Sequence, residues 1–302
     1  MKKLFSYGPL LIVVAASLWA LDGIIRRSLY SLPSITIVFY EHLFGAVILL
    51  PYLIWSFKKE GLTKKEFFLL LFISMFSGVL GTLWFTTALL KTNFISFSVV
   101  YLIQKLQPIF AISAAAIFLK EKITKSYVKW AVLALVAAYF VTFKNGVINF
   151  STGSGTVIAA LYALGAAFAW GSSTVFSKMA LVKRPSMYVT SLRFFLTSIL
   201  ALGMVFAFGQ SQSLTSPTIS QFGRFLLIAV STGMFSVAIY YHGLKKVPAN
   251  VSTILELVYP LLAVLIDATL YKSFLAPSQY LAGVILLFAI FQISKIQLNQ
   301  SK

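Results

Sequence analysis

Leu18-Trp19-Ala20, near the start of the chain, returns as Ala169-Trp170-Gly171 about half a chain later. Other matches follow in the same order, 151 to 155 residues apart: Glu41 with Arg193, Gly78 with Gly233, Lys91 with Lys246, and Leu106-Gln107-Pro108 with Val258-Tyr259-Pro260. A shared order and near-constant spacing indicate a duplication. We predict two repeats, residues 1–145 and 154–302, joined by a polar, glycine-bearing segment.

The composition excludes a soluble domain. The 302 residues are 59% hydrophobic and 11% charged, with a mean hydropathy of +0.91, whereas soluble domains are roughly half apolar and a quarter charged. There is no cysteine, so disulfides and thiolate metal sites are excluded, and we expect no metal and no cofactor. The net charge of +18 comes from short basic pairs between apolar runs, without the stripe or motif of a nucleic-acid-binding protein.

The apolar runs are long enough to cross a bilayer, which takes about 20 residues per helix. Ten runs qualify: Tyr7–Leu29, Ser34–Ser56, Glu66–Leu90, Phe94–Leu119, Tyr127–Phe143, Gly155–Ser177, Met187–Gly209, Phe222–Leu244, Ala249–Tyr271 and Ala276–Ile293. Because five helices per repeat is an odd number, the second repeat enters the membrane from the opposite side. We therefore predict an all-α membrane protein of ten transmembrane helices arranged as two inverted five-helix repeats.

The basic residues set the expected orientation. With a cytoplasmic N-terminus, 17 of the 25 Lys and Arg residues fall on the inner side and six on the outer side, Arg26 and Arg27 among them. The other two, Lys105 and Arg193, lie within spans. The positive-inside rule then predicts a multi-pass protein of the cytoplasmic membrane with both termini inside the cell.

Two prolines interrupt matching helices of the repeats. A proline removes a backbone donor and crowds the carbonyl four residues earlier, which belongs to Gln104 for Pro108 and to Glu256 for Pro260. Two polar residues at matched helix breaks indicate a central binding site. The competing interpretation is a pair of packing kinks, which leaves the intramembrane Lys105 unexplained.

Aromatic residues complete the predicted site, because ring faces suit an organic or cationic solute. The predicted substrate-binding residues are Trp19, Asp22, Trp84, Tyr101, Gln104, Lys105, Trp170, Tyr240, Glu256 and Tyr259.

The roles of two carboxylates stay open at this point. Asp22 lies three residues after Trp19, nearly on the same helix face. Asp22 or Glu256 contacts the solute or carries a coupling proton, or else each forms a salt bridge, Asp22 with Arg26 and Glu256 with Lys105. For Glu41 we expect a structural pairing with neighbouring helices.

These residues resemble the drug/metabolite transporter superfamily, specifically its ten-helix EamA branch, over nearly the whole chain. The resemblance rests on Leu18-Trp19-Ala20, Ala169-Trp170-Gly171, Gly81-Thr82-Leu83-Trp84-Phe85, and Leu106-Gln107-Pro108-Ile109-Phe110 leading to Leu119-Lys120-Glu121-Lys122-Ile123-Thr124. It implies a cavity formed by the first, third and fourth helices of each half. It also implies transport of small organic solutes, often amino acids or their relatives and commonly outward. Ser273 stands where the second half would repeat Glu121, and Glu41 where such proteins often carry arginine.

We therefore predict a secondary active transporter, not an enzyme, that moves a small organic solute by alternating access, with protons as a candidate coupling ion and oligomeric state open. The alternatives are a channel or structural membrane protein and an intramembrane protease. The protease motifs are absent from the sequence: Asp22 and Asp267 lack a Gly-x-Gly-Asp setting, and there is no Gly-x-Ser-x-Gly turn. There is also no phosphate-binding glycine loop, which argues against ATP-driven pumping by this chain alone.

Overall fold

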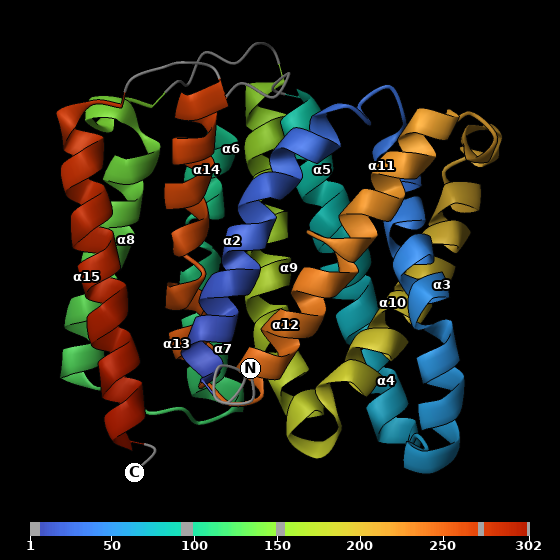
Figure 1. Ribbon diagram of the computed structural model, residues 1–302, viewed down its shortest axis with the longest axis horizontal. Coiled ribbons are helices and arrows are strands. Elements are labelled where there is room, and N and C mark those ends of the chain that lie inside the picture. Colours follow the sequence, from blue (N-terminus) through green and yellow to red (C-terminus); the bar gives the residue numbers. More distant parts are fainter. Residues whose placement is uncertain (1–6, 92–98, 149–154, 271–274, 301–302) are drawn as a thin grey trace.

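The computed structural model describes residues 7–91, 99–148, 155–270 and 275–300, and every regular element within these ranges is a helix (Figure 1). The elements of the first half are α2 (Gly8–Arg27), α3 (Ser34–Glu60), α4 (Lys64–Ile73), the π-helix η1 (Ser74–Gly81), α5 (Thr82–Lys91), α6 (Val99–Gln104), α7 (Gln107–Phe118), α8 (Lys125–Thr142) and η2 (Lys144–Gly146). Those of the second half are α9 (Thr156–Lys183), α10 (Ser186–Ala207), η3 (Ser211–Leu214), α11 (Ile219–Val230), α12 (Met234–Leu244), α13 (Ala249–Leu255), α14 (Val258–Leu270) and α15 (Pro277–Gln300).

Nine helical segments in the described ranges are long and apolar enough to cross a membrane. Their outward side chains are large and apolar, such as Phe68 and Val284, which are 65% and 67% exposed. These findings confirm an all-α, multi-pass membrane protein. The predicted fourth span, Phe94–Leu119, begins outside the described residues, and its described part consists of the short helices α6 and α7.

The helix breaks lie directly before the two prolines. α6 ends at Gln104 and α7 begins at Gln107, while α13 ends at Leu255 and α14 begins at Val258. Pro108 and Pro260 each occupy the first turn of the new helix, where a missing N–H costs no hydrogen bond. Each break therefore leaves a polar residue, Lys105 or Glu256, in a turn within the membrane region.

The third helix of each half is also irregular, which the sequence pattern did not predict. In the first half the π-helix η1 joins α4 to α5, and in the second half a turn at Ser231–Gly233 separates α11 from α12. The predicted span Phe222–Leu244 agrees with the apolar segment Ile219–Leu244, but it contains a helix break that the sequence did not predict. Ser236 bridges the turn by donating to the carbonyls of Thr232 and Gly233, so the freed backbone groups find partners inside the protein.

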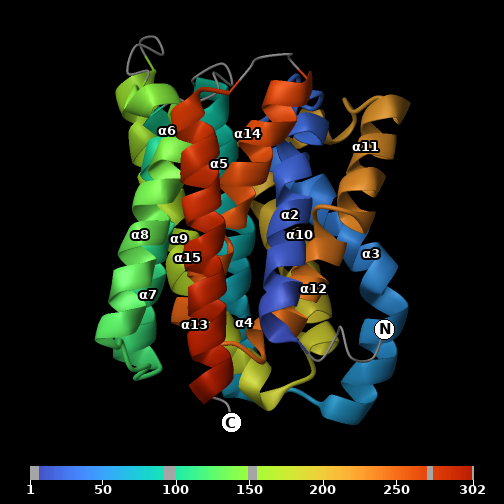
Figure 2. The ribbon, with the colours of Figure 1, turned by 60° about the vertical axis from the view of Figure 1, so that its left-hand side comes forward.

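The two halves interlock. α2 packs against α12 and α14 of the second half, and α9 packs against α5, α6 and α7 of the first. α3 packs against α10 and α8 against α15, which also joins the halves. α2 and α9 run in opposite directions (Figure 1). Figure 2 shows α8 and α15 side by side at one edge. Because each first helix lies among helices of the other half, any central cavity is shared by both.

The start of α2 and the end of α15 lie at the same end of the molecule (Figure 1). At that end Arg184 donates to Glu66 at 2.7 Å and lies 3.6 Å from Glu60, and its hydrogen bonds with Glu66 raise the pKa of the guanidinium above its ordinary value. Glu121 accepts hydrogen bonds from the backbone N–H groups of Ala249 and Asn250, at 2.7 and 2.9 Å. These contacts link the halves at the end that carries the termini.

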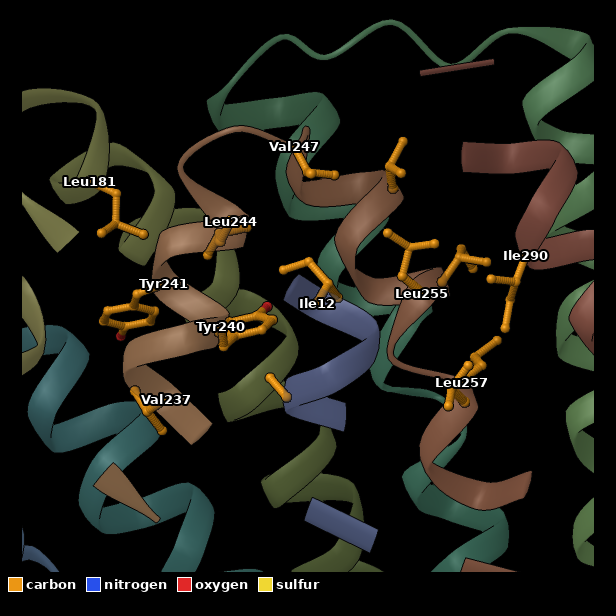
Figure 3. Close-up of a cluster of buried hydrophobic side chains, with 14 of the residues drawn as sticks. Ile12, Leu181, Val237, Tyr240, Tyr241, Leu244, Val247, Leu255, Leu257 and Ile290 are labelled. Atoms are coloured by element: carbon orange, nitrogen blue, oxygen red, sulfur yellow. The ribbon is translucent and has the colours of Figure 1, made fainter. Parts of the chain in front are cut away.

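An apolar cluster lies between that end and the centre of the molecule. Figure 3 shows Ile12 of α2 beside Leu244 and Val247, with Leu255 of α13 on its other side. Ile12, Leu244, Val247 and Leu255 are completely buried, and between helices in a membrane such side chains contribute through close van der Waals packing. This packing holds α2, which carries Trp19 and Asp22, against α13 and against α12, which carries Tyr240.

Candidate functional site

A cavity of about 250 Å³ lies at the interface of the halves, with walls from α2, α5, α9, α12 and both broken helices. Its aromatic lining residues are Trp19, Phe85, Trp170, Phe194, Tyr240, Tyr241 and Tyr259. Its charged lining residues are Asp22, Arg26, Glu41, Lys105, Arg193 and Glu256. The cavity thus combines ring faces with ionisable groups inside the membrane region.

Glu256 is surrounded by neutral hydrogen-bond donors. Its Oε1 accepts from the Tyr240 phenol at 2.6 Å and the Ser252 hydroxyl at 3.2 Å. Its Oε2 accepts from Nε2 of Gln107 at 3.2 Å, and Gln107 in turn accepts from Gln104 at 2.7 Å. This chain joins the two helix breaks, so the turns predicted at matched positions meet in one polar network.

Lys105 occupies the same region without an acidic partner among the described residues. Its Nζ lies 5.7 Å from the ring centroid of Tyr259, within the range of a cation–π contact. The proposed salt bridge between Lys105 and Glu256 is not among the ion pairs of the described residues. The ring of Tyr259, which lies just after the second break, is the contact of the Lys105 ammonium group in place of Glu256.

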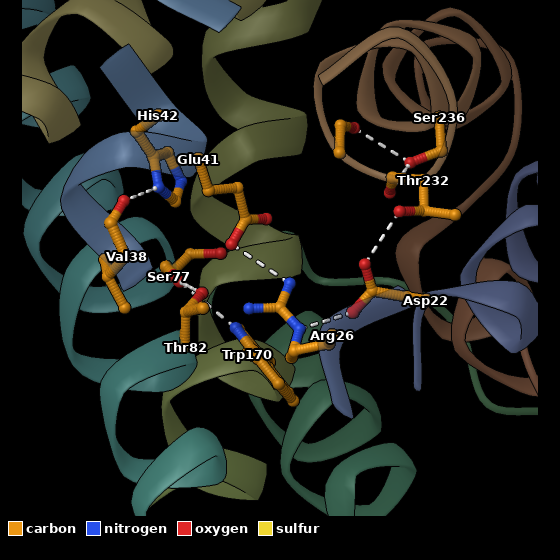
Figure 4. Close-up of polar contacts among 11 residues, drawn as sticks. Asp22, Arg26, Val38, Glu41, His42, Ser77, Thr82, Trp170, Thr232 and Ser236 are labelled. Atoms are coloured by element: carbon orange, nitrogen blue, oxygen red, sulfur yellow. Dashed lines mark hydrogen bonds and ion pairs between the residues drawn. The ribbon is translucent and has the colours of Figure 1, made fainter. Parts of the chain in front are cut away.

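Asp22, Arg26 and Glu41 form a second polar network (Figure 4). Arg26 donates from Nε to Asp22 at 2.6 Å and from Nη2 to Glu41 at 3.0 Å. Thr232, from the turn between α11 and α12, donates to the other oxygen of Asp22 at 2.7 Å. The salt-bridge interpretation of Asp22 is therefore the one the structure shows, and Glu41 has the expected structural pairing.

Arg193 forms a third network among the lining residues. Its Nη1 donates to the Tyr241 hydroxyl at 3.0 Å and its Nη2 to the Ser77 hydroxyl at 2.8 Å. The Trp170 indole donates to the Ser77 carbonyl at 3.1 Å (Figure 4). Arg193 is thus held by neutral groups, and its repeat mate Glu41 takes Arg26 instead.

The tryptophans differ in where they lie. The rings of Trp19 and Tyr240 are 5.1 Å apart and those of Trp170 and Phe85 are 5.2 Å apart, and all four side chains line the cavity. Trp84 is not among the lining residues that the structure describes. Its ring covers Gly165 of α9, where an added Cβ would lie 2.8 Å from it, so the next residue, Phe85, faces the cavity.

Of the predicted binding residues, the structure brings together Trp19, Asp22, Gln104, Lys105, Trp170, Tyr240, Glu256 and Tyr259 at one cavity. Tyr101 lies in α6, but its side chain is outside the described part of the structure. Sequence reasoning missed Arg26, Phe85, Arg193 and Thr232 as lining residues. Arg26 was counted with the outer loops, although it is only 6% exposed; its spacing of four from Asp22 was the available signal.

Several lining atoms are buried without a hydrogen-bond partner. They are Nη1 of Arg26, Oε1 of Gln104, Oγ of Ser173, Nε of Arg193 and Oγ1 of Thr253. Buried polar groups are normally satisfied, so donors and acceptors left open around a cavity are typical of a site for a polar solute. Within the described ranges, no three His, Cys, Asp or Glu side chains are grouped as metal ligands.

Comparison with known proteins agrees with this architecture. The model of the EamA-like transporter family matches residues 6–143 and again residues 157–295. The chain is 36% identical over 299 residues to the riboflavin transporter ImpX of Fusobacterium nucleatum, covering 96% of this chain and 98% of that protein. It is 27% identical over 256 residues to an uncharacterized transporter of Synechocystis sp., covering 80% of this chain and 70% of the relative.

A solved crystal structure shares the fold, with a TM-score of 0.75 at 15% identity over 98% of this chain and 99% of the other. The two matches to the family model and the 36% identical relative confirm the resemblance inferred from the tryptophan and proline motifs. With two matches to the family, membrane-spanning helices and a full-length transporter relative, the chain is a multi-pass membrane transporter for a small solute and belongs to the EamA-like transporter family.

Proposed function

We propose that this chain is a secondary active carrier for riboflavin. The observation that carries the proposal is the cavity at the two helix breaks, walled by aromatic rings and open amide and hydroxyl groups, in a chain 36% identical to a riboflavin transporter along nearly its whole length. The resemblance alone favoured amino acids or related metabolites. The density of aromatic rings favours a flat heterocycle instead.

The chemistry of riboflavin fits these walls. Its isoalloxazine ring is flat and aromatic, and one edge alternates carbonyl acceptors with an N–H donor. The ring faces of Trp19, Tyr240 and Phe85 offer stacking partners. Gln104, whose Oε1 has no partner, offers an acceptor for the ring N–H. The hydroxyls of the ribityl chain match the unpaired Ser173 and Thr253 hydroxyls.

The proposed mechanism is alternating access by ten helices in two inverted repeats, residues 1–145 and 154–302. Inverted halves exchange conformations to turn an outward-open site into an inward-open one. Because the basic residues are concentrated at the end that carries the termini, we assign that end to the cytoplasm. The contacts of Glu66 and Glu121 across the halves would then break when the carrier opens inward.

For a coupling proton, Glu256 is the better candidate of the two carboxylates that the sequence offered. Asp22 is in an ion pair with Arg26 at 2.6 Å, so its carboxylate already has a charged partner. Glu256 accepts only from the neutral groups Tyr240, Ser252 and Gln107, each able to turn its hydrogen bond when the carboxylate gains a proton.

Transport by the purified protein in lipid vesicles tests the proposal. We expect saturable uptake of radiolabelled riboflavin and counterflow, in which vesicles loaded with unlabelled riboflavin accumulate the label transiently. Vesicles loaded with and without riboflavin also report whether transport runs inward and outward. Uptake that does not saturate and shows no counterflow supports the alternative of a channel, and counterflow with amino acids alone rules out riboflavin.

A further inference from the structure

The positive charge of Arg26 is matched by two carboxylates of the protein, Asp22 and Glu41. Arg26 is 6% exposed, and its two ion pairs engage Nε and Nη2. Asp22 and Glu41 approach it from different helices, α2 and α3, and Thr232 of the second half fixes Asp22 at 2.7 Å. The guanidinium is therefore held from two sides, and only Nη1 has no partner.

The charges around the cavity balance. The carboxylates are Asp22, Glu41 and Glu256, and the basic side chains are Arg26, Lys105 and Arg193. His42 also lines the cavity; it is 3% exposed, its Nδ1 faces the Val38 carbonyl at 2.8 Å, and it has no carboxylate contact among the described residues, so we count it as neutral. With all three carboxylates ionised, the formal charges of the lining sum to zero and offer no net attraction to a charged solute. Lys105 and Arg193 have no carboxylate partner among the described residues, so stabilisation of the wild type by inorganic phosphate would overturn a selectivity for uncharged solutes.

The position of the charges matters as much as their sum. A free arginine is the side chain best suited to bind a phosphate. Here a phosphate reaching Nη1 of Arg26 would lie next to Asp22 and Glu41, whose negative charges repel it strongly in a site with little water. A neutral carbonyl or hydroxyl oxygen accepts the same hydrogen bond without that repulsion.

We propose that Asp22 and Glu41 make the cavity selective for uncharged solutes by occupying Arg26, so that riboflavin is accepted and its 5′-phosphate is rejected. Glu41 is then a specificity-determining residue. The identity of the flavin rests on the proposed function, whereas the exclusion of phosphate rests on the geometry around Arg26.

The test is ligand binding to the purified full-length protein, read from thermal stabilisation with riboflavin, riboflavin 5′-phosphate and inorganic phosphate. We expect the wild type to prefer riboflavin over its phosphate by about tenfold or more. In Glu41→Gln, Arg26 loses one of its two carboxylate partners and can pair with an anion. The preference for riboflavin over its phosphate should then fall by about tenfold. Inorganic phosphate should stabilise this variant and leave the wild type unchanged.

Two controls separate Arg26 from a general change of potential. Glu60→Gln removes the same charge beside Arg184, outside the cavity, and should leave the preference unchanged. Adding Arg26→Gln to Glu41→Gln removes the freed cation and should restore rejection of phosphate. If Glu41→Gln does not fold, Asp22→Asn releases Arg26 from the other side and carries the same expectation.

The outcomes distinguish this inference from the proposed function. If the wild type binds no riboflavin but phosphate stabilises Glu41→Gln alone, the riboflavin assignment fails and the role of Glu41 stands. If the wild type binds riboflavin and neither Glu41→Gln nor Asp22→Asn gains affinity for either phosphate compound, the selectivity proposal is overturned. An equal gain in Glu60→Gln also overturns it.

Discussion

Tyr240 donates a hydrogen bond from its phenol to Oε1 of Glu256 at 2.6 Å, joining the regular helix α12 to the break before α14. The same ring lies 5.1 Å from Trp19 of the first half. Through this one residue, a carboxylate in a broken helix, an aromatic wall and the interface of the halves are connected. A change at Glu256 is therefore expected to move side chains of both halves that line the cavity.

We expect Glu256→Gln to retain riboflavin counterflow and to lose accumulation driven by a pH gradient. The amide keeps the size and one acceptor of the carboxylate, but it cannot take up and release a proton as a carboxylate does. Uptake into vesicles with and without an imposed pH gradient measures the difference. Glu60→Gln is the comparison, because its carboxylate lies beside Arg184, outside the cavity, and it should keep gradient-driven accumulation. Full accumulation in Glu256→Gln would exclude this residue as the proton carrier.

Trp19 and Trp84 should behave differently when replaced by alanine. Trp19 lines the cavity and contacts Tyr240, so Trp19→Ala should weaken riboflavin binding about tenfold, since an aromatic contact is worth about 0.5–1.5 kcal/mol beyond its buried area. Trp84 packs on Gly165, so Trp84→Ala should destabilise the fold by up to about 3 kcal/mol with little change in affinity. Binding and melting curves of both variants measure this. Equal losses of affinity would place Trp84 at the site after all.

Gly171 permits a close approach of α9 to the start of α7, just after the first helix break. A Cβ at this position would lie 2.6 Å from the Gln107 carbonyl and 2.9 Å from Cβ of Phe110, so Gly171→Ala must push α9 away from α7. We expect a loss of about 1–3 kcal/mol of stability and slower transport. Gly203→Ala is the matched control, since nothing lies within 4 Å of its added Cβ, and it should be neutral or slightly stabilising. Equal melting temperatures for both variants would contradict the packing argument.

Glu121 links the halves by accepting the N–H groups of Ala249 and Asn250. Glu121→Ala leaves two backbone donors without this partner, which should cost about 1–3 kcal/mol. We expect a lower melting temperature and, because the contact lies at the end assigned to the cytoplasm, faster labelling of a cysteine introduced at Ser177 by a thiol reagent added from that end. Lys122→Ala changes an exposed neighbour and should alter neither quantity. Unchanged labelling in Glu121→Ala would show that this contact does not close the cavity.

Much of the architecture followed from the sequence because it depends on local properties. Apolar length predicts membrane helices wherever the chain must satisfy its own backbone in lipid. The breaks at Gln104 and Glu256 were predictable because proline acts on its own helix. The interruption between α11 and α12 was missed, since Ser231-Thr232-Gly233 has no proline and its turn is completed by the side chain of Ser236.

The sequence alone determined a duplicated membrane protein with two proline-broken helices and a set of intramembrane polar residues. Only the tertiary structure decided which of those residues meet. Arg26 pairs with Glu41 of the next helix in addition to Asp22 of its own, Glu256 pairs with Tyr240 and not with Lys105, and Phe85 faces the cavity in place of Trp84. The physical reason is that a charge in the membrane requires a partner, and the partner is chosen by the rotation and crossing of helices far apart in the chain, which no local pattern records.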